Sequence, residues 1–246
     1  MEIMKFSIRR KSKFIKKAAF GSALLMVSAF AIYTPRAYAE ERNHVKTETP
    51  DSAFTARKVF EKLHCSALEI LSPSSRLDML DYWDVDSIAK ITNVMDGLSW
   101  LEEVTPDYLK VRITPVSTLE IKILPMKKGS LAMTVYTVGD DVQAEDSQIK
   151  FYDMNLAEVP TEKYFSIPRV KDFFEIPKGS ATKMKEIEQM IPFPTIAITA
   201  NPKNNNLEAR LTVEKYINED DWNIAKLFVK PFITLEWKKE KYHLVK

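Results

Sequence analysis

Two neighbouring segments with apolar side chains at every second position constrain the fold more than any other feature of the chain. Side chains of a β-strand point alternately to its two faces, so this period of two predicts strands with one apolar and one hydrated face. The segments are 108–113 and 118–123, and Pro115 lies between them, where a short turn is expected. The pattern therefore predicts an antiparallel hairpin. Its apolar positions are Leu109, Val111, Ile113, Leu119, Ile121 and Ile123.

Further strands are expected on both sides of a helical stretch in the second half of the chain. Residues 131–138 and 148–152 predict two strands, joined by an acidic loop at 140–146 that we expect to be solvated. Later in the chain, short apolar segments predict four more strands, at 195–199, 207–213, 233–237 and 242–245. The strands thus come in two groups.

Helices are predicted before each group of strands, where apolar residues recur at spacings of three and four. The first predicted helix begins at Asp51 or Ser52 and ends near Leu71, before Pro73, and a short second helix begins at Ser75. A third begins at Asp84 or Asp86 and ends at Gly97, with Ile88, Ile91 and Met95 inward. In the second half, a short helix or turn is predicted at 170–174, a helix from Ser180 to before Pro192, and another from Asn218.

The order of these elements predicts an α+β fold, in which flanking helices cover an antiparallel sheet built from meander hairpins. No Gly/Ser-rich or Pro-rich linker divides the chain after residue 50, so a single domain is expected over 51–246. Two similar helix-then-sheet halves, 51–160 and 161–246, are the alternative, because 113–123 resembles 198–211 locally. A duplication and a chance likeness between amphipathic hairpins both explain that resemblance.

The N-terminal residues have the three parts of a secretory signal peptide. A basic segment, 1–17, precedes a 16-residue apolar run at 18–33, and Ala37 and Ala39 then form a small-residue cleavage site before Glu40. A helix of that length spans about 24 Å, which is short for a hydrocarbon core of about 30 Å. We therefore predict a cleaved signal at 1–39, a flexible lead-in at 40–50, and export to the periplasm or the cell exterior, with no stable membrane span after cleavage. An uncleaved anchor helix is the alternative.

Removal of this segment changes the charge balance. Residues 1–39 hold eight of the 36 basic residues and one of the 34 acidic ones, so the remaining chain carries a net charge of −5. An acidic chain offers no electrostatic reason to bind nucleic acid. A single cysteine excludes an intrachain disulfide framework, and five glycines leave no room for a Gly-rich nucleotide loop. No cofactor is expected.

Three blocks of sequence together resemble a known family. They are Arg76-Leu77-Asp78-Met79-Leu80-Asp81-Tyr82 before Thr92-Asn93, then Asp107-Tyr108-Leu109 with Ser117-Thr118-Leu119-Glu120, and Lys230-Pro231-Phe232 with Leu235-Glu236-Trp237. The family that these blocks resemble is the domain-of-unknown-function 3256 family of exported proteins from Bacteroidetes-type bacteria. The resemblance covers most of residues 54–245. It implies the envelope of a Gram-negative bacterium, and it carries over no catalytic residue because the family has no assigned activity.

Aromatic residues are the main candidates for a binding surface. Exposed tyrosine and tryptophan rings on a sheet suit sugar stacking or a protein interface. The alternative is that helices or the second half of the chain cover them, since large aromatic residues are usually buried. The candidates are Tyr82, Trp83, Trp100, Tyr136 and Tyr152, with Tyr108 on the same expected face as the last two.

No catalytic residue or metal ligand can be assigned from the sequence. His64 and Cys65 are adjacent, and neighbours on a helix point about 100° apart, so they do not form a nucleophile–base pair there. Four aspartates, at 78, 81, 84 and 86, are dense enough to suggest calcium, but their spacing does not match a calcium-binding loop. Helix capping and the helix dipole explain them better.

These observations favour an exported, non-catalytic protein that acts by binding. The leading hypothesis is a protein-interaction or binding module of the cell envelope, with another envelope protein as partner. A glycan-directed binding protein or hydrolase, which would use Trp and Tyr platforms and a carboxylate pair, is the alternative. A structural envelope component without a small ligand is a third reading, and the sequence does not choose between it and the first.

Overall fold

The computed structural model describes residues 53–140, 142–177 and 179–245 of the chain. All of them belong to one compact unit. The predicted signal peptide at 1–39, its cleavage residues Ala37, Ala39 and Glu40, and the lead-in at 40–50 lie outside the described residues. Within them, no helix is long and apolar enough to cross a membrane.

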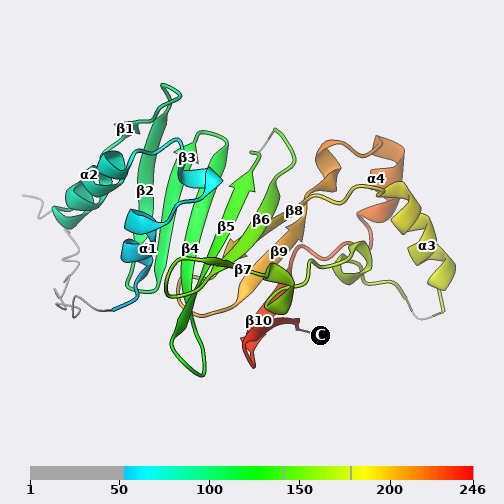
Figure 1. Cartoon of the computed structure of the whole chain (residues 1–246). Helices are drawn as coiled ribbons and strands as arrows, with labels where there is room; N and C mark the ends of the chain where they lie inside the picture. The colour runs from blue at the N-terminus through cyan, green and yellow to red at the C-terminus, as the bar shows by residue number, and fades with distance from the viewer. Residues whose placement is uncertain (1–52, 141, 178, 246) are drawn as a thin grey trace, which may run out of the picture. The chain divides into compact units, whose positions relative to one another are not determined.

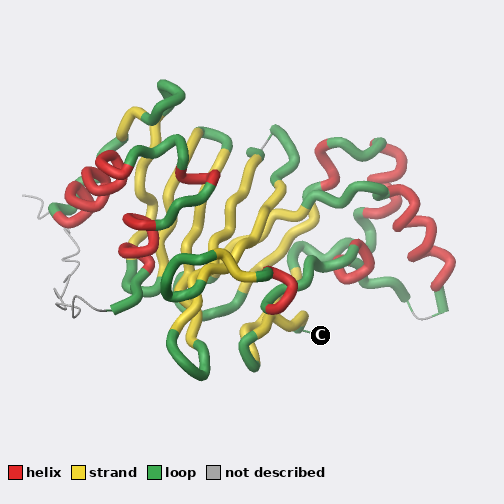
Figure 2. The backbone as a smooth tube through the Cα atoms, viewed as in Figure 1, coloured by secondary structure: helices red, strands yellow, loops and turns green. Residues whose placement is uncertain are grey.

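Two antiparallel sheets form the framework (Figures 1 and 2). The first has seven strands in the order of the chain: β1 (Ile91–Thr92), β2 (Leu98–Val104), β3 (Tyr108–Thr114), β4 (Ser117–Pro125), β5 (Ser130–Val138), β6 (Asp146–Tyr152) and β7 (Glu158–Val159). The second has four, in the order β11-β10-β9-β8: β8 (Ile196–Ala200), β9 (Leu207–Leu211), β10 (Ile233–Lys238) and β11 (Lys241–Leu244). Each sheet is a meander, so the predicted α+β class with antiparallel sheets is confirmed.

Helices accompany both sheets. The α-helices are α1 (Ala56–Lys62), α2 (Pro73–Asp84), α3 (Ala181–Met190) and α4 (Glu219–Ala225). Short 3₁₀ turns are η1 (Ser66–Leu68), η2 (Thr161–Lys163), η3 (Val170–Phe173) and η4 (Val213–Lys215). Figure 1 shows α1 and α2 against one face of the seven-stranded sheet, where α1 contacts β3 and β4 and α2 contacts β2.

The predicted hairpin forms as expected because its apolar positions all face this helix layer. Leu109 lies opposite Ile121 and Val111 lies opposite Leu119, and all four side chains are buried against Val59 and other residues of α1 and α2. Burial of each such side chain contributes about 1.5–3 kcal/mol. The polar positions of the same strands therefore face the other side of the sheet.

The second sheet covers part of that other side. A core cluster joins Met133, Val135 and Phe151 of the first sheet to Ile198 and Leu235 of the second. Strand β8 contacts β4, β5 and β6. The chain thus has one apolar core on each face of the seven-stranded sheet.

Side chains of the first sheet close the outer edge of β8. The backbone N–H groups of Ile196, Ile198 and Ala200 donate to Asp146 Oδ1 (3.0 Å), Ser147 Oγ (2.8 Å) and Glu120 Oε2 (2.6 Å). Unpaired edge N–H groups invite pairing with another chain. These three hydrogen bonds satisfy that edge and fix β8 across the first sheet.

The first predicted helix is shorter than expected. The Thr55 side chain accepts from Lys58 N and caps α1, which ends at Lys62 because Leu63 is extended. Pro73, expected to stop a helix, instead begins α2 at the first helical position, where its missing N–H costs nothing. Ser72, not Ser75, is the N-cap, and its Oγ accepts from Ser75 N at 3.0 Å.

The predicted helix ending at Gly97 does not form. Residues 85–90 are irregular, and β1 and β2 form a hairpin whose turn is organised by buried Asn93. The Asn93 side chain accepts from Met95 N and Gly97 N and donates to Ser99 Oγ. Ile88 and Met95, expected inside, are exposed. Strand β2 was not predicted at all.

The second half of the chain follows the prediction more closely. Helix α3 begins after Ser180, α4 begins after Asn218, and the Asn218 side chain accepts from Asp220 N at 2.8 Å. The predicted strands at 195–199, 207–213, 233–237 and 242–245 correspond to β8–β11. The two rounds of helix and sheet differ in size, with seven strands in one and four in the other.

Candidate functional site

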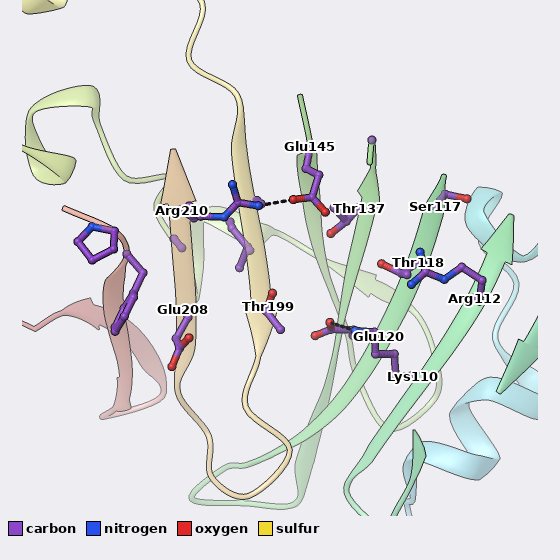
Figure 3. A pocket seen from close by; sticks show the side chains of 16 residues that line it. Lys110, Arg112, Ser117, Thr118, Glu120, Thr137, Glu145, Thr199, Glu208 and Arg210 are labelled. Carbon is purple, nitrogen blue, oxygen red and sulfur yellow. Dashed lines mark hydrogen bonds and ion pairs between the residues drawn. The ribbon is translucent and has the colours of Figure 1, made fainter. Parts of the chain in front are cut away.

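A pocket of about 330 Å³ lies between the two sheets (Figure 3). Its walls come from β3, β4 and β5 on one side and from β8 and β9 on the other. The lining is rich in charged and hydroxyl side chains, and Phe232, half of whose surface is exposed (50%), supplies an aromatic wall. The labelled lining residues are Lys110, Arg112, Ser117, Thr118, Glu120, Thr137, Glu145, Thr199, Glu208 and Arg210.

A chain of ion pairs runs along the first-sheet wall. Arg112 Nε donates to Glu102 Oε1 at 2.9 Å, and Lys110 Nζ lies 3.6 Å from Glu102 Oε2 and 3.7 Å from Glu120 Oε1. Lys110 and Arg112 sit two residues apart on β3, so their side chains share the face away from the helices. The residue alternation that builds the hairpin therefore also places these charges in the pocket.

Glu120 is the buried acid of the pocket. It is 4% exposed, and its Oε2 accepts the hydrogen bond from Ala200 N. Burial raises the pKa of Glu120 to about 7, although the Ala200 N–H and the Lys110 charge favour the ionised form. The carboxyl group can therefore change charge near neutral pH, in contact with both sheets.

An ion pair between Arg210 and Glu145 bridges β9 and the loop before β6 (Figure 3). Thr212 Oγ1 also donates to the Glu145 carbonyl at 2.6 Å. The acidic loop at 140–146 was expected to be solvated, but Glu145 and Asp146 instead bind the second sheet. Asp140 keeps the expected role, because its Oδ1 accepts from Val142 N within the loop, and Asp141 lies outside the described residues.

Lys122 forms a second link between the sheets, two residues beyond Glu120 on β4. Its ammonium group donates to Asp107 Oδ2 at 2.8 Å and to the Pro202 carbonyl at 3.2 Å, and it lies 5.8 Å from the Tyr108 ring centroid. The Lys122 side chain is 1% exposed, whereas that of Asp107 is 53% exposed. Burial tends to raise the pKa of Asp107, but the hydrogen bond and charge of Lys122 bring it below its ordinary value.

The predicted aromatic surface does not exist as a single face. Trp83 and Tyr136 are partly buried in the core under α1 and α2, and Tyr152 is 2% exposed in the same core, so it cannot serve as a surface platform. Tyr82 is exposed on α2. Trp100 faces the other side of the sheet, directly opposite Arg112 in register, with Lys90 Nζ 5.1 Å from its ring centroid.

The other candidate clusters also separate. Cys65 is a free, half-buried thiol in extended backbone, next to exposed His64. Burial raises the pKa of the Cys65 thiol, which disfavours a reactive thiolate. In the described part of the chain, no group of three or more His, Cys, Asp or Glu side chains could hold a metal ion, and this includes the aspartates at 78–86.

The inter-sheet pocket could not be predicted from the sequence. Lys110, Arg112 and Glu120 were recognised only as the polar positions of alternating strands. A polar position on a half-covered sheet face looks the same in sequence whether it faces water or a second sheet. Burial of Glu120 depends on β8, which is 76 residues later in the chain, so no local pattern signals it.

The protein is of the α+β class, with two antiparallel meander sheets. Helices cover one face of the larger sheet, and a charged pocket lies between the sheets. A family model, "Protein of unknown function (DUF3256)", matches residues 51–242, and the chain belongs to that family. The resemblance stated from the sequence is thereby confirmed. A search of curated proteins found no match.

A solved structure has a similar fold. It is described as the structure of a domain of an uncharacterized protein from Porphyromonas gingivalis W83, and it superposes with a TM-score of 0.66 at 19% sequence identity. The match covers 78% of this chain and 99% of that one. At this identity the likeness shows a shared fold and nothing about activity.

Proposed function

We propose that this chain is an exported, non-catalytic binding protein of the cell envelope, and that the pocket between the sheets binds a hydroxyl-rich ligand such as a glycan. Export rests on the basic, apolar and Ala-x-Ala segments of residues 1–39. The observation that carries the binding role is the pocket lining, in which charged and hydroxyl side chains from both sheets converge beside an exposed aromatic ring.

The chemistry of the lining suits sugar hydroxyl groups. Carboxylates accept hydrogen bonds and guanidinium and ammonium groups donate them, so neighbouring hydroxyls of one sugar can be paired from both sides. Thr118, Thr137 and Thr199 add hydroxyls that both donate and accept. The exposed ring of Phe232 offers an apolar face against which a sugar ring can pack.

Binding is favoured over hydrolysis because most of the charged groups already have partners within the protein. Glu102 pairs with Arg112 and Lys110, Glu145 pairs with Arg210, and Glu120 accepts from the β8 backbone. Glycosidases instead use two carboxyl groups that flank the bond to be cut. Glu208 is exposed and is the pocket acid best placed to contact a ligand directly.

The test is a glycan array probed with residues 40–246, compared with two matched variants. Phe232→Ala is expected to lower the affinity for the bound glycans about tenfold, because a stacking contact is worth roughly 1–1.5 kcal/mol. Phe193→Ala removes a ring that is more exposed (78%) and does not line the pocket, so this variant should bind as the wild type does. Equal loss in both variants, or no glycan bound by the wild type, would count against the proposal.

A second candidate function, contact with another envelope protein, is favoured by one observation. Large apolar side chains are exposed in close succession on α2, on the segment after it and on the β1–β2 hairpin, and we call this the α2–β1 surface. It comprises Leu77, Tyr82, Val85, Ile88, Val94, Met95 and Leu98. Contiguous exposed apolar patches commonly mark protein interfaces, and β1 is the edge strand of its sheet.

Charge placed on this surface should abolish such an interaction without unfolding the protein. Val85→Asp and Met95→Asp alter side chains that are 71% and 72% exposed, so each should change stability by less than about 0.5 kcal/mol. The measurement is stoichiometric recovery of one partner from the envelope with the wild type and its loss with the double variant. Undiminished recovery with the double variant would show that the partner binds elsewhere.

A further inference from the structure

A second pocket, of about 560 Å³, lies apart from the first, where the helix layer meets the strands β6 and β7. Its residues come from the end of α1, from η1, from the start of α2 and from the two strands. The charged groups that face it are Arg76, Lys150, Glu69 and Glu158, together with His64 and the thiol of Cys65. None of these residues lines the inter-sheet pocket.

Arg76 is the buried charge of this second pocket. It is 3% exposed, and its Nη1 donates to the carbonyls of Phe60 (2.7 Å) and Leu63 (2.9 Å) at the end of α1. Its Nε has no hydrogen-bond partner, and no carboxylate in the described ranges 53–140, 142–177 and 179–245 forms an ion pair with its guanidinium. Burial lowers the pKa of Arg76, with partial compensation from Cys65 and Glu61.

The buried guanidinium of Arg76 lacks the charged partner that such a group usually has. A buried guanidinium usually pairs with a carboxylate or phosphate, because an uncompensated buried charge is costly. Of the two acids that line the pocket, Glu158 is already bound to Lys150 at 2.9 Å, and Glu69 is exposed. Among the described residues, the Arg76 guanidinium therefore has a buried N–H donor without an acceptor, at the wall of this pocket.

We propose that this pocket binds a small oxyanion, a carboxylate or phosphate group of a ligand, with Arg76 as its buried anchor and Lys150 at its rim. The free edge of the guanidinium supplies N–H donors in the planar arrangement that oxyanions accept. Lys150 can exchange its exposed partner Glu158 for the ligand, since an exposed ion pair is worth little. This site is independent of the proposed function and of the inter-sheet pocket.

Cys65 makes the proposal testable without altering Arg76, which caps α1 and whose loss would destabilise the fold. It is the single cysteine of the chain and it lines the pocket. A ligand bound there should shield its thiol. The measurement is the rate at which neutral iodoacetamide alkylates Cys65 in residues 40–246, in sodium phosphate, sodium acetate or sodium chloride of equal ionic strength.

Phosphate or acetate is expected to slow alkylation saturably, roughly tenfold at ten times its Kd, because only the free form reacts. The anion that gives the saturable effect identifies phosphate or carboxylate as the preferred group. Lys150→Gln should raise the anion concentration needed for half-maximal protection about tenfold, since a charge-assisted contact is lost. Lys185→Gln, an exposed lysine on α3, is the control and should match the wild type. Equal rates in all three salts, or equal protection in Lys150→Gln and the wild type, would overturn the proposal.

Discussion

Asp107→Ala is expected to lower the free energy of unfolding by about 3 kcal/mol, although Asp107 itself is half exposed. The variant leaves the ammonium group of Lys122 buried at 1% exposure, with the Pro202 carbonyl and the Tyr108 ring as its neighbours. Removal of one partner from a buried ion pair costs about 3–5 kcal/mol. Access of water from the Asp107 side places the expected cost at the lower end. Urea denaturation of residues 40–246 measures it.

Two further variants separate the buried charge from other causes. Lys122→Met in the Asp107→Ala background removes the unpaired charge and should recover most of the lost stability. Glu186→Ala breaks the exposed pair of Lys183 and Glu186 on α3 and should cost less than about 1 kcal/mol. A cost for Asp107→Ala as small as that of Glu186→Ala would show that the Lys122 ammonium is solvated, and the link between β4 and the β8–β9 turn would lose its support.

Glu120→Gln is expected to remove a pH dependence of stability that the wild type shows between pH 4.5 and 7. The pKa of Glu120 is raised in the folded state to about 7 from the ordinary 4.5. Between these values the folded protein binds more protons than the unfolded chain, so the free energy of unfolding falls as pH rises. Across the whole range, this difference in pKa corresponds to a fall of about 3 kcal/mol in the free energy of unfolding. Glutamine stays neutral and should show no such fall.

The comparison is made by urea denaturation at several pH values from 4 to 8. The stability of the wild type relative to Glu120→Gln should be greatest at pH 4 and decline steadily to pH 8. Glu208→Gln, which removes an exposed carboxylate from the same pocket, corrects for the change in net charge. A rise of wild-type stability relative to Glu120→Gln with pH would contradict the burial of this carboxyl group between the sheets.

Local patterns predicted the strands that alternate strictly. In β3 and β4 the alternating apolar residues from Leu109 to Ile113 and from Leu119 to Ile123 face the helix layer, so the period of two in sequence is also the burial pattern in space. The terminal hairpin and the helices that begin after Ser180 and Asn218 follow from equally local signals. These elements need no knowledge of the rest of the fold.

Residues 84–97 were predicted wrongly because their pattern is ambiguous. Ile88, Ile91 and Met95 are spaced by three and four, as in an amphipathic helix, yet two of them are exposed. The conformation there is set by long-range contacts of Asn93, whose amide donates to the Ile113 carbonyl at 3.2 Å. Tertiary contacts of this kind override local propensity.

The sites were less predictable than the fold. Glu120, Lys122 and Arg76 are charged residues that become buried only when distant segments pack on them. The aromatic residues gave a misleading signal. Tyr152 belongs to the core on the helix side of the seven-stranded sheet, whereas Trp100 lies on the other face of that sheet. Composition and periodicity report burial of apolar residues well and burial of paired charges poorly.

Binding of a glycan in the pocket between the sheets is tested most directly by an NMR titration. Amide chemical shifts of ¹⁵N-labelled residues 40–246 should be followed while the strongest glycan from the array is added. Saturable shifts are expected to cluster on the pocket walls, at 110–120, 197–199 and 208–210. Shifts confined to the α2–β1 surface, or none at saturating glycan, would contradict binding in the pocket.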